Sequence, residues 1–196
     1  MFAWLNVGSI LISAVLFLIF YNLSVSPAQL EQKMGAGAAG AYEKCGRYRV
    51  VAMIFMLIAA INYVIYYFYP LPISLPQTFA WGWPISIVIG VVIAIPSFWV
   101  MARGLIDAGP EAVAPKKEHT MYGGIYEKIR HPQALGEMWT YHIIGFLLNS
   151  PFLVLLSFIW LPIFYWICVA EEKDLVVRYG RSFIEYQQRT GFLWPR

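Results

Sequence analysis

Five long apolar runs dominate this sequence, and they constrain its fold more than any other feature. A helix needs about 20 apolar residues to cross the ~30 Å hydrocarbon core of a bilayer. Only 13% of the 196 residues are charged, whereas soluble domains contain about 25%. The sequence therefore predicts an all-α integral membrane protein, with five transmembrane helices in a single membrane domain. The predicted spans cover residues 3–21, 50–69, 78–102, 134–148 and 152–170.

The last two predicted spans are separated only by Asn149, Ser150 and Pro151. A connection this short predicts a tight antiparallel hairpin, because proline and small polar residues favour turns. The fourth span is short for a full crossing and contains Glu137 and His142, so it fits a transmembrane helix less well than the other four.

The 14 Lys and Arg residues fall in three segments, residues 21–50, 103–131 and 171–196. If the chain crosses five times, these segments lie on one side of the membrane and the other side has no basic residue. The positive-inside rule then places the N-terminus outside and the three segments in the cytoplasm. Four or six crossings would divide the basic residues between the two sides.

The tail after the fifth span has an apolar stripe at helical spacing, formed by Leu175, Tyr179, Phe183 and Tyr186. This pattern predicts a C-terminal cytoplasmic amphipathic helix, which Gly180 would bend. We expect the cytoplasmic segments 103–133 and 171–196 to form the part of the protein that binds a cofactor.

Several functional classes are disfavoured by composition. The net charge of +3 is small, and no basic stripe interleaves with aromatic residues, so nucleic acid is not expected as a partner. Cys45 and Cys168 are far apart and outside any C-x-x-C motif. Both are expected to be free thiols, and no metal site is predicted. The sequence also lacks the H-E-x-x-H motif and the phosphate-binding glycine loop.

Four ionisable residues meet at the ends of the predicted hairpin. Arg130 and His131 open the fourth span, and Glu171 and Glu172 close the fifth. Both ends return to the same membrane face, so the four side chains should be neighbours. Ionisable groups at membrane depth are costly and are often functional. A purely structural ion pair between interfacial anchors is the alternative that spacing alone leaves open.

Two motifs give this cluster a family resemblance. The first runs from His119 to Gly136 and reads H-T-M-Y-G-G-I-Y, then R-H-P-x-x-x-G; the second runs from Glu171 to Tyr186 and reads E-E-x-x-L, then Y-G-x-x-F-x-x-Y. In this order, they resemble the isoprenylcysteine carboxyl methyltransferase family of integral membrane enzymes. The resemblance covers residues 103–196. Ala134 stands where that family has tyrosine.

The resemblance implies S-adenosylmethionine as the cofactor. It implies a cofactor site formed by His119, Met121, Tyr122, Gly124, Tyr126, Arg130, His131, Pro132, Leu135, Gly136, Glu171 and Glu172. We expect Arg130 and Glu172 to be catalytic, because a guanidinium suits the carboxylate of the methyl donor and a carboxylate suits its ammonium group. The protein would mainly align donor and acceptor.

The resemblance also implies a lipidic methyl acceptor that enters the site from the bilayer. The family acceptor is the carboxylate of a prenylated cysteine, which is already ionised and needs no general base. A phospholipid amine is an alternative, and it would require proton removal by a Glu or His. Two further alternatives are an NADPH-dependent enzyme like the sterol reductases, with Lys116 and Lys117 near a 2′-phosphate, and a non-catalytic membrane scaffold.

Overall fold

The computed structural model describes residues 1–35, 40–112, 116–117 and 121–196, and all of their side chains except that of Glu111. Within these ranges the regular structure is helical, apart from one isolated bridge between Ile129 and Gly191. The elements are α1 (Phe2–Ser24), α2 (Pro27–Met34), α3 (Ala41–Phe68), α4 (Gly82–Ala108), η1 (Gly109–Ala112), η2 (Gly124–Glu127), α5 (Pro132–Glu137), α6 (Thr140–Leu147), α7 (Pro151–Ser157), α8 (Trp160–Tyr179) and α9 (Arg181–Arg189).

Four stretches of the described chain are long and apolar enough to cross a membrane: α1, α3, α4 and the combined stretch of α7 and α8. Large apolar side chains such as Val92 and Trp166 point outward on these helices. Helices also satisfy their own backbone hydrogen bonds, which a bilayer demands of any spanning segment. The chain is therefore an all-helical, multi-pass membrane protein with four candidate spans.

The prediction of five transmembrane helices is wrong at the fourth span, residues 134–148. This segment is not one helix, because α5 ends at Glu137 and α6 begins only at Thr140. At about 1.5 Å per residue, neither piece alone approaches the length of a membrane crossing. Together they still bring the chain to the opposite end of the bundle, where the Phe79 amide before α4 donates to the Asn149 carbonyl. Both pieces lie against α4, where Gly136 packs on Ser97 and Leu147 packs on Gly90.

Several helix ends also differ from the limits of the apolar runs. The second predicted span begins at residue 50, but α3 begins at Ala41, and α4 continues past residue 102 to Ala108. Charged residues can continue these helices beyond their apolar parts, because a charged side chain at the membrane surface stays in contact with water and has no desolvation cost. The eight-residue helix α2 was not predicted at all.

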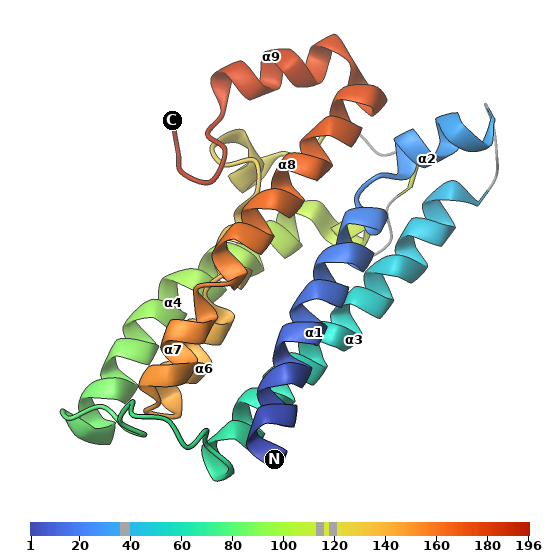
Figure 1. The fold of residues 1–196 in the computed structure, drawn as a ribbon. Coiled ribbons are helices and arrows are strands. Elements are labelled where there is room, and N and C mark those ends of the chain that lie inside the picture. The colour runs from blue at the N-terminus through green and yellow to red at the C-terminus, as the bar shows by residue number, and fades with distance from the viewer. Residues whose placement is uncertain (36–39, 113–115, 118–120) are drawn as a thin grey trace.

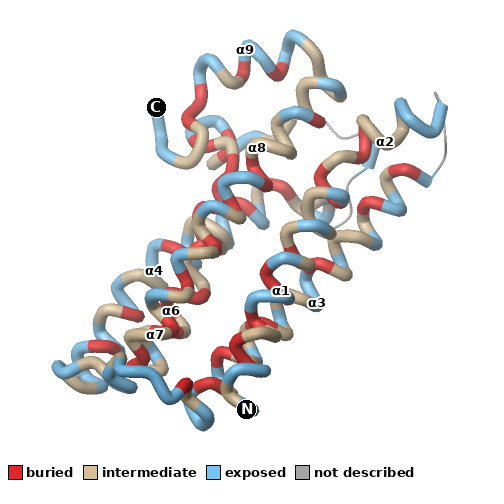
Figure 2. The backbone as a smooth tube through the Cα atoms, viewed as in Figure 1, coloured by how far each residue is buried: buried red, intermediate tan, exposed pale blue. Residues whose placement is uncertain are grey.

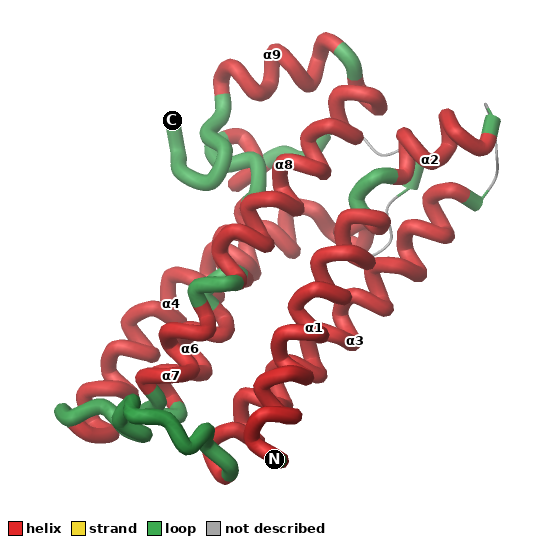
Figure 3. The backbone as a smooth tube through the Cα atoms, viewed as in Figure 1, coloured by secondary structure: helices red, strands yellow, loops and turns green. Residues whose placement is uncertain are grey.

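The helices form two groups that lie side by side. Figure 1 shows α1 and α3 as an antiparallel pair next to a second group that contains α4, α6, α7 and α8. The N-terminus lies at one end of the bundle, and α2, α9 and the C-terminus lie at the other. Figure 3 shows most loops at these two ends, with one break between α7 and α8 part-way along the bundle.

Aromatic side chains join the two groups. The ring of Phe17 on α1 lies 5.6 Å from that of Trp160 on α8, and the Tyr63 ring on α3 lies 4.9 Å from that of Tyr141 on α6. Tyr141 and Trp160 stack in turn at 3.9 Å. Figure 2 shows buried positions alternating with exposed ones along α1, α3 and α8, as expected when one side of each helix packs on its neighbours.

The predicted hairpin is confirmed at its turn. Asn149 has a φ of 51°, and the Ser150 hydroxyl accepts a hydrogen bond from the Leu153 amide, which caps α7. The turn sends α7 and α8 back along α6, so the start of α5 and the last turns of α8 come to lie at the same end of the bundle (Figure 1).

Candidate functional site

A cavity of about 1120 Å³, including the space at its mouth, lies at the end of the bundle that carries the charged segments. Both helix groups contribute to its wall. Tyr21 and Arg49 come from α1 and α3, whereas Cys168 and Glu171 come from α8. The cavity is open to solvent at its mouth, and polar and aromatic side chains converge on it, as they do in small-molecule sites.

An ion cluster forms one side of the cavity, as the hairpin predicted. The Nε of Arg130 donates to Oε1 of Glu172 across 2.5 Å. The His131 imidazole lies between the two carboxylates, with Nε2 at 3.1 Å from Glu172 and Nδ1 at 3.4 Å from Glu171. The prediction that these helix ends are neighbours is confirmed.

Helix α9 and the chain after it complete this cluster. The Nη1 of Arg130 donates to the carbonyls of Gln187, at 3.1 Å, and Thr190, at 2.5 Å. The Gln187 amide donates to Oε2 of Glu172 at 2.6 Å. Both oxygens of Glu172 are thus engaged, and Arg130 is tied to three segments of the chain.

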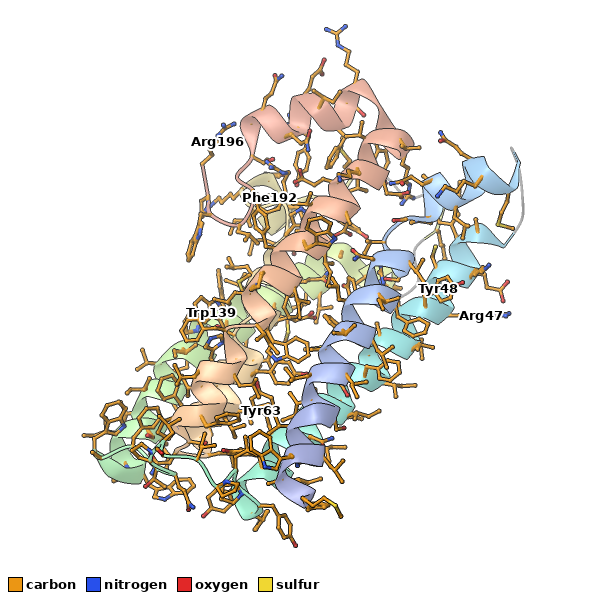
Figure 4. All side chains as sticks on the ribbon, viewed as in Figure 1. Arg47, Tyr48, Tyr63, Trp139, Phe192 and Arg196 are labelled. Carbon is orange, nitrogen blue, oxygen red and sulfur yellow. The ribbon has the colours of Figure 1, made fainter. Side chains whose placement is uncertain are left out.

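Phe192 covers the outer side of the cluster. Its ring lies 5.5 Å from the Arg130 guanidinium and 5.0 Å from the His131 ring. Figure 4 labels it beside α8, below α9. A ring face attracts a cation, and it also keeps water away from it.

The charge state of His131 follows from these neighbours. Burial lowers the pKa of the imidazole, but contact with the Cys168 thiol and the Glu171 and Glu172 carboxylates outweighs burial and raises the pKa well above its usual range. An imidazolium between two carboxylates is the expected form at neutral pH.

The segment around η2 is held by tyrosine hydroxyls. The Tyr126 hydroxyl donates to the carbonyl of Gly104 on α4 at 3.3 Å, and the Tyr186 hydroxyl donates to the Tyr126 carbonyl at 2.6 Å. The Tyr122 and Tyr126 rings lie 4.7 Å apart.

Gly124 has a φ of 65° and packs on Asp107, where a side chain would overlap the carboxylate. Glycine is needed there for both reasons.

Seven of the predicted cofactor residues line the cavity: Met121, Tyr122, Tyr126, Arg130, His131, Pro132 and Glu171. Four others lie behind them or away from the cavity: Gly124, Leu135, Gly136 and Glu172. His119 lies outside the described residues. Glu171 and Glu172 therefore differ, because the first faces the cavity and the second holds Arg130 and His131.

The cavity also includes residues that sequence reasoning did not place in the site. Tyr179, Phe183 and Tyr186 were quoted in the second motif but not assigned to the site, and all three line the cavity. Tyr21 and Arg49 lie outside both motifs. The sequence shows that both residues lie at the ends of apolar runs. It does not show the direction in which their side chains point.

Helix α2 is fastened to α8 beside the cavity. Oδ1 and Oδ2 of the buried Asp174 accept hydrogen bonds from the amides of Gln29, at 2.8 Å, and Ala28, at 3.2 Å. Free amides at a helix N-terminus favour such a carboxylate. Val25, which follows α1, and Pro27, the first residue of α2, are part of the cavity wall.

Comparison with known proteins bears on the same part of the chain. Neither the curated proteins nor the solved structures contain a match. A family model described as phospholipid methyltransferase matches residues 80–182, more than half of the 196 residues. The match runs from just before α4 into α9 and includes the Arg130 and Glu172 ion pair. The chain belongs to the phospholipid methyltransferase family.

Proposed function

We propose that this protein transfers a methyl group from S-adenosylmethionine to the amine nitrogen of a phospholipid headgroup. Phospholipid methylation is the named activity of its family, whose members use S-adenosylmethionine. The chain is accordingly a membrane methyltransferase that depends on this cofactor, as the sequence predicted. The observation that carries the choice of acceptor is the Glu171 carboxylate in the cavity wall.

The isoprenylcysteine acceptor favoured by the motifs has weaker support. The matching family and the isoprenylcysteine carboxyl methyltransferases belong to one clan of membrane methyltransferases, so shared motifs at the cofactor do not distinguish their acceptors. The family match names phospholipid. The prenylated cysteine therefore becomes a comparison in the experiment below.

The residues around the cavity suit the cofactor. The rings of Tyr122 and Tyr126 offer π faces to a purine. The Nη2 of Arg130 has no acceptor among the described residues, so it can bind a carboxylate while Nε and Nη1 stay engaged. Bound there, S-adenosylmethionine would supply an electrophilic methyl group, and the protein would align it with the acceptor.

Glu172 has a supporting role in this proposal. Both of its oxygens are engaged, by Arg130 and His131 on one side and Gln187 on the other. It fixes the guanidinium and the imidazole rather than contacting a ligand. The expectation that Arg130 and Glu172 act in catalysis thus becomes a proposal that Arg130 binds the donor and Glu172 positions Arg130.

Glu171 would receive the headgroup amine. Its side chain is 37% exposed, and its Oε2 lies 3.4 Å from Nδ1 of His131. A headgroup ammonium has no lone pair, so it must lose a proton before its nitrogen can form the new N–C bond. Glu171 accepts that proton and passes it to water at the cavity mouth. The C–S bond of the donor breaks as the N–C bond forms, and its electron pair stays on sulfur.

The orientation of the protein follows from its charge. The basic segments lie at the end of the bundle that carries α2 and α9, opposite the N-terminus (Figure 1). We propose that this end faces the cytoplasm. Labelling of cysteines introduced at residue 2 or residue 196 by a membrane-impermeant reagent, in sealed cells, would test this.

The acceptor is tested with the purified protein and S-adenosylmethionine that carries a labelled methyl group. Phosphatidylethanolamine and a farnesylated N-acetylcysteine are offered separately, and each product is then treated with alkali. A methyl ester is hydrolysed and releases its label as methanol, whereas an N-methyl group stays with the lipid. Alkali-stable label on phosphatidylethanolamine supports the proposal. Alkali-labile label on the prenylcysteine alone overturns it.

The role of Glu171 is tested with Glu171→Gln. We expect transfer to fall at least 100-fold, the usual range for loss of a general base. S-adenosylmethionine should bind with unchanged affinity in calorimetry. If the variant instead loses cofactor affinity, Glu171 holds the donor, as the motif resemblance implied, and the proposed proton transfer is wrong.

A further inference from the structure

We infer that Arg49 binds the phosphate of the acceptor headgroup, an inference that rests on the proposed phospholipid acceptor and specifies how it is held. Arg49 lies on α3, outside the residues that match the family. Its side chain lines the cavity together with Glu171.

The hydrogen bonds and ring contacts of Arg49 include no carboxylate of the described residues. Nη1 donates to the Ala112 carbonyl at 2.6 Å, and the guanidinium lies 5.7 Å from the Tyr21 ring. Nε is buried and has no hydrogen-bond partner among the described residues. No carboxylate of those residues lies within 4.0 Å of the guanidinium. A partly buried cation of this kind favours an anionic ligand, because the ligand would restore lost interactions.

The other arginines nearby are engaged differently. Arg130 is paired with Glu172, and Arg178 donates to the carbonyls of Lys116 and Lys117. Arg47, two residues before Arg49 on the same helix, pairs with Glu43 at the surface. Figure 4 shows Arg47 projecting from α3 away from the bundle. The position of Arg49 in the cavity wall is therefore not a general property of basic residues at this end of α3.

A structural role as an interfacial anchor would fit the position of Arg49 along α3, but not its direction. Anchoring arginines extend toward lipid headgroups or water around the protein. Arg49 instead extends to the Ala112 carbonyl after α4, and both residues line the cavity. This direction brings its charge into the space where we place the acceptor.

The chemistry of a phospholipid amine matches this pair of opposite charges. Its phosphodiester is anionic, and its amine is separated from the phosphate by only two carbons, so both groups must bind close together. Arg49 and Glu171 both line the cavity, one with a cation and the other with a carboxylate. A guanidinium binds phosphate oxygens in a bidentate manner. Arg49 would hold the phosphate while Glu171 receives the amine.

The test compares two acceptors and three variants. The acceptors are a phosphatidylethanolamine and a long-chain primary amine that lacks phosphate. Arg49→Gln keeps a donor for the Ala112 carbonyl, Arg49→Lys keeps the charge, and Arg47→Gln removes a charge from the same helix but outside the cavity. We expect Arg49→Gln to raise KM for the phospholipid about 10- to 100-fold, the worth of one charged hydrogen-bonding contact. The kcat, the KM for the simple amine and the affinity for S-adenosylmethionine should stay unchanged.

A binding measurement separates this inference from the proposed reaction. Dioctanoyl-phosphatidylcholine has the phosphodiester but no amine that can be methylated, and dioctanoylglycerol lacks the phosphate. We expect the first lipid to raise the thermal unfolding midpoint more than the second in the wild type and in Arg47→Gln. Arg49→Gln should lose this difference, and Arg49→Lys should keep part of it. This result would hold even if phosphatidylethanolamine were not methylated.

Two results would overturn the inference. One is an equal response to phosphatidylcholine in folded Arg49→Gln and the wild type. The other is a loss of S-adenosylmethionine affinity in Arg49→Gln with an unchanged phospholipid KM, which would place Arg49 at the donor. If Arg49→Gln does not fold, Arg49→Lys decides, because lysine lacks the planar fork and should raise the phospholipid KM while sparing the simple amine.

Discussion

The guanidinium of Arg130 and the carboxylate of Glu172 meet across 2.5 Å, although 42 residues separate them in the chain. Their side chains are only 11% and 14% exposed. The pair joins the start of α5 to the last turns of α8, and it holds the guanidinium against the tail after α9 through the Thr190 carbonyl. The pair therefore joins distant parts of the fold, and it holds Arg130 in the wall of the cavity that we propose as the cofactor site.

Removal of one partner of this ion pair should destabilise the fold. Glu172→Gln leaves the Arg130 charge largely buried without a counter-ion, which typically costs about 3 kcal/mol. We expect a clearly lower thermal unfolding midpoint, measured with a thiol-reactive dye that labels the buried Cys45 and Cys168 on unfolding. Glu185→Gln is the control, because it breaks the exposed pair with Arg181 and should have almost no effect. Equal midpoints for the two variants would contradict this prediction.

Gly136 should not tolerate a side chain. A Cβ at this position would overlap the Ser97 carbonyl and the Met101 side chain on α4. Overpacking of this kind costs about 1–3 kcal/mol, so Gly136→Ala should lower the unfolding midpoint. Gly8→Ala is the matched control, since a Cβ on Gly8 meets nothing within 4 Å and alanine favours a helix. An unchanged midpoint for Gly136→Ala would show that α5 does not pack closely on α4.

The raised pKa of His131 should make stability fall at alkaline pH. The unfolded imidazole has a pKa of about 6.5, and the folded pKa lies well above that value. The ion-pair stabilisation is fully present below pH 6.5 or so, and it is lost as pH rises through the folded pKa. Unfolding followed by tryptophan fluorescence should therefore give a falling midpoint in the alkaline range.

His131→Gln serves as the comparison, because glutamine keeps hydrogen bonding but cannot carry the charge. Its midpoint should be lower than that of the wild type near neutral pH, and it should vary less through the alkaline range. A parallel pH profile for both proteins would mean that another group causes the alkaline loss.

Asp174 should control the order of α2. Its carboxylate accepts from two amides at the start of that helix, and an asparagine could replace only part of this acceptor capacity. We expect Asp174→Asn to speed hydrogen exchange in peptides that cover Pro27–Met34 while exchange in α4 stays unchanged. Because Pro27 lines the cavity, ligand affinity should also weaken. Uniformly faster exchange in both helices would instead indicate global destabilisation.

Much of the fold could be predicted because apolar length and charge segregation act locally. Residues 3–21 and 78–102 correspond to α1 and α4, and the meeting of Arg130 with Glu172 followed from the hairpin alone. The fourth span could not be predicted, because its interruption near Trp139 depends on packing against α4 rather than on composition.

The candidate site was predictable where motifs carried it, and not elsewhere. The seven predicted residues that line the cavity were found because their order resembles a known pattern. That pattern did not separate the cavity-facing Glu171 from Glu172, since neighbouring residues on a helix point about 100° apart and only tertiary packing decides which faces inward. Arg49 was missed for a related reason, because the direction of its side chain depends on how α3 packs on α1, α2 and α6.

The short backbone bridge between Ile129 and Gly191 has a consequence for the end of the chain. The Arg130 amide donates to the Gly191 carbonyl, and the Gly191 amide donates to the Lys128 carbonyl. The proposed binding of the donor at Arg130 and the docking of the tail would therefore be thermodynamically linked, and linkage is reciprocal. S-adenosylmethionine should therefore protect the last residues from carboxypeptidase. Release of the tail should lower the affinity for S-adenosylmethionine by the same factor by which the ligand favours the docked tail. The docked state of the tail would thus depend on whether the site is occupied.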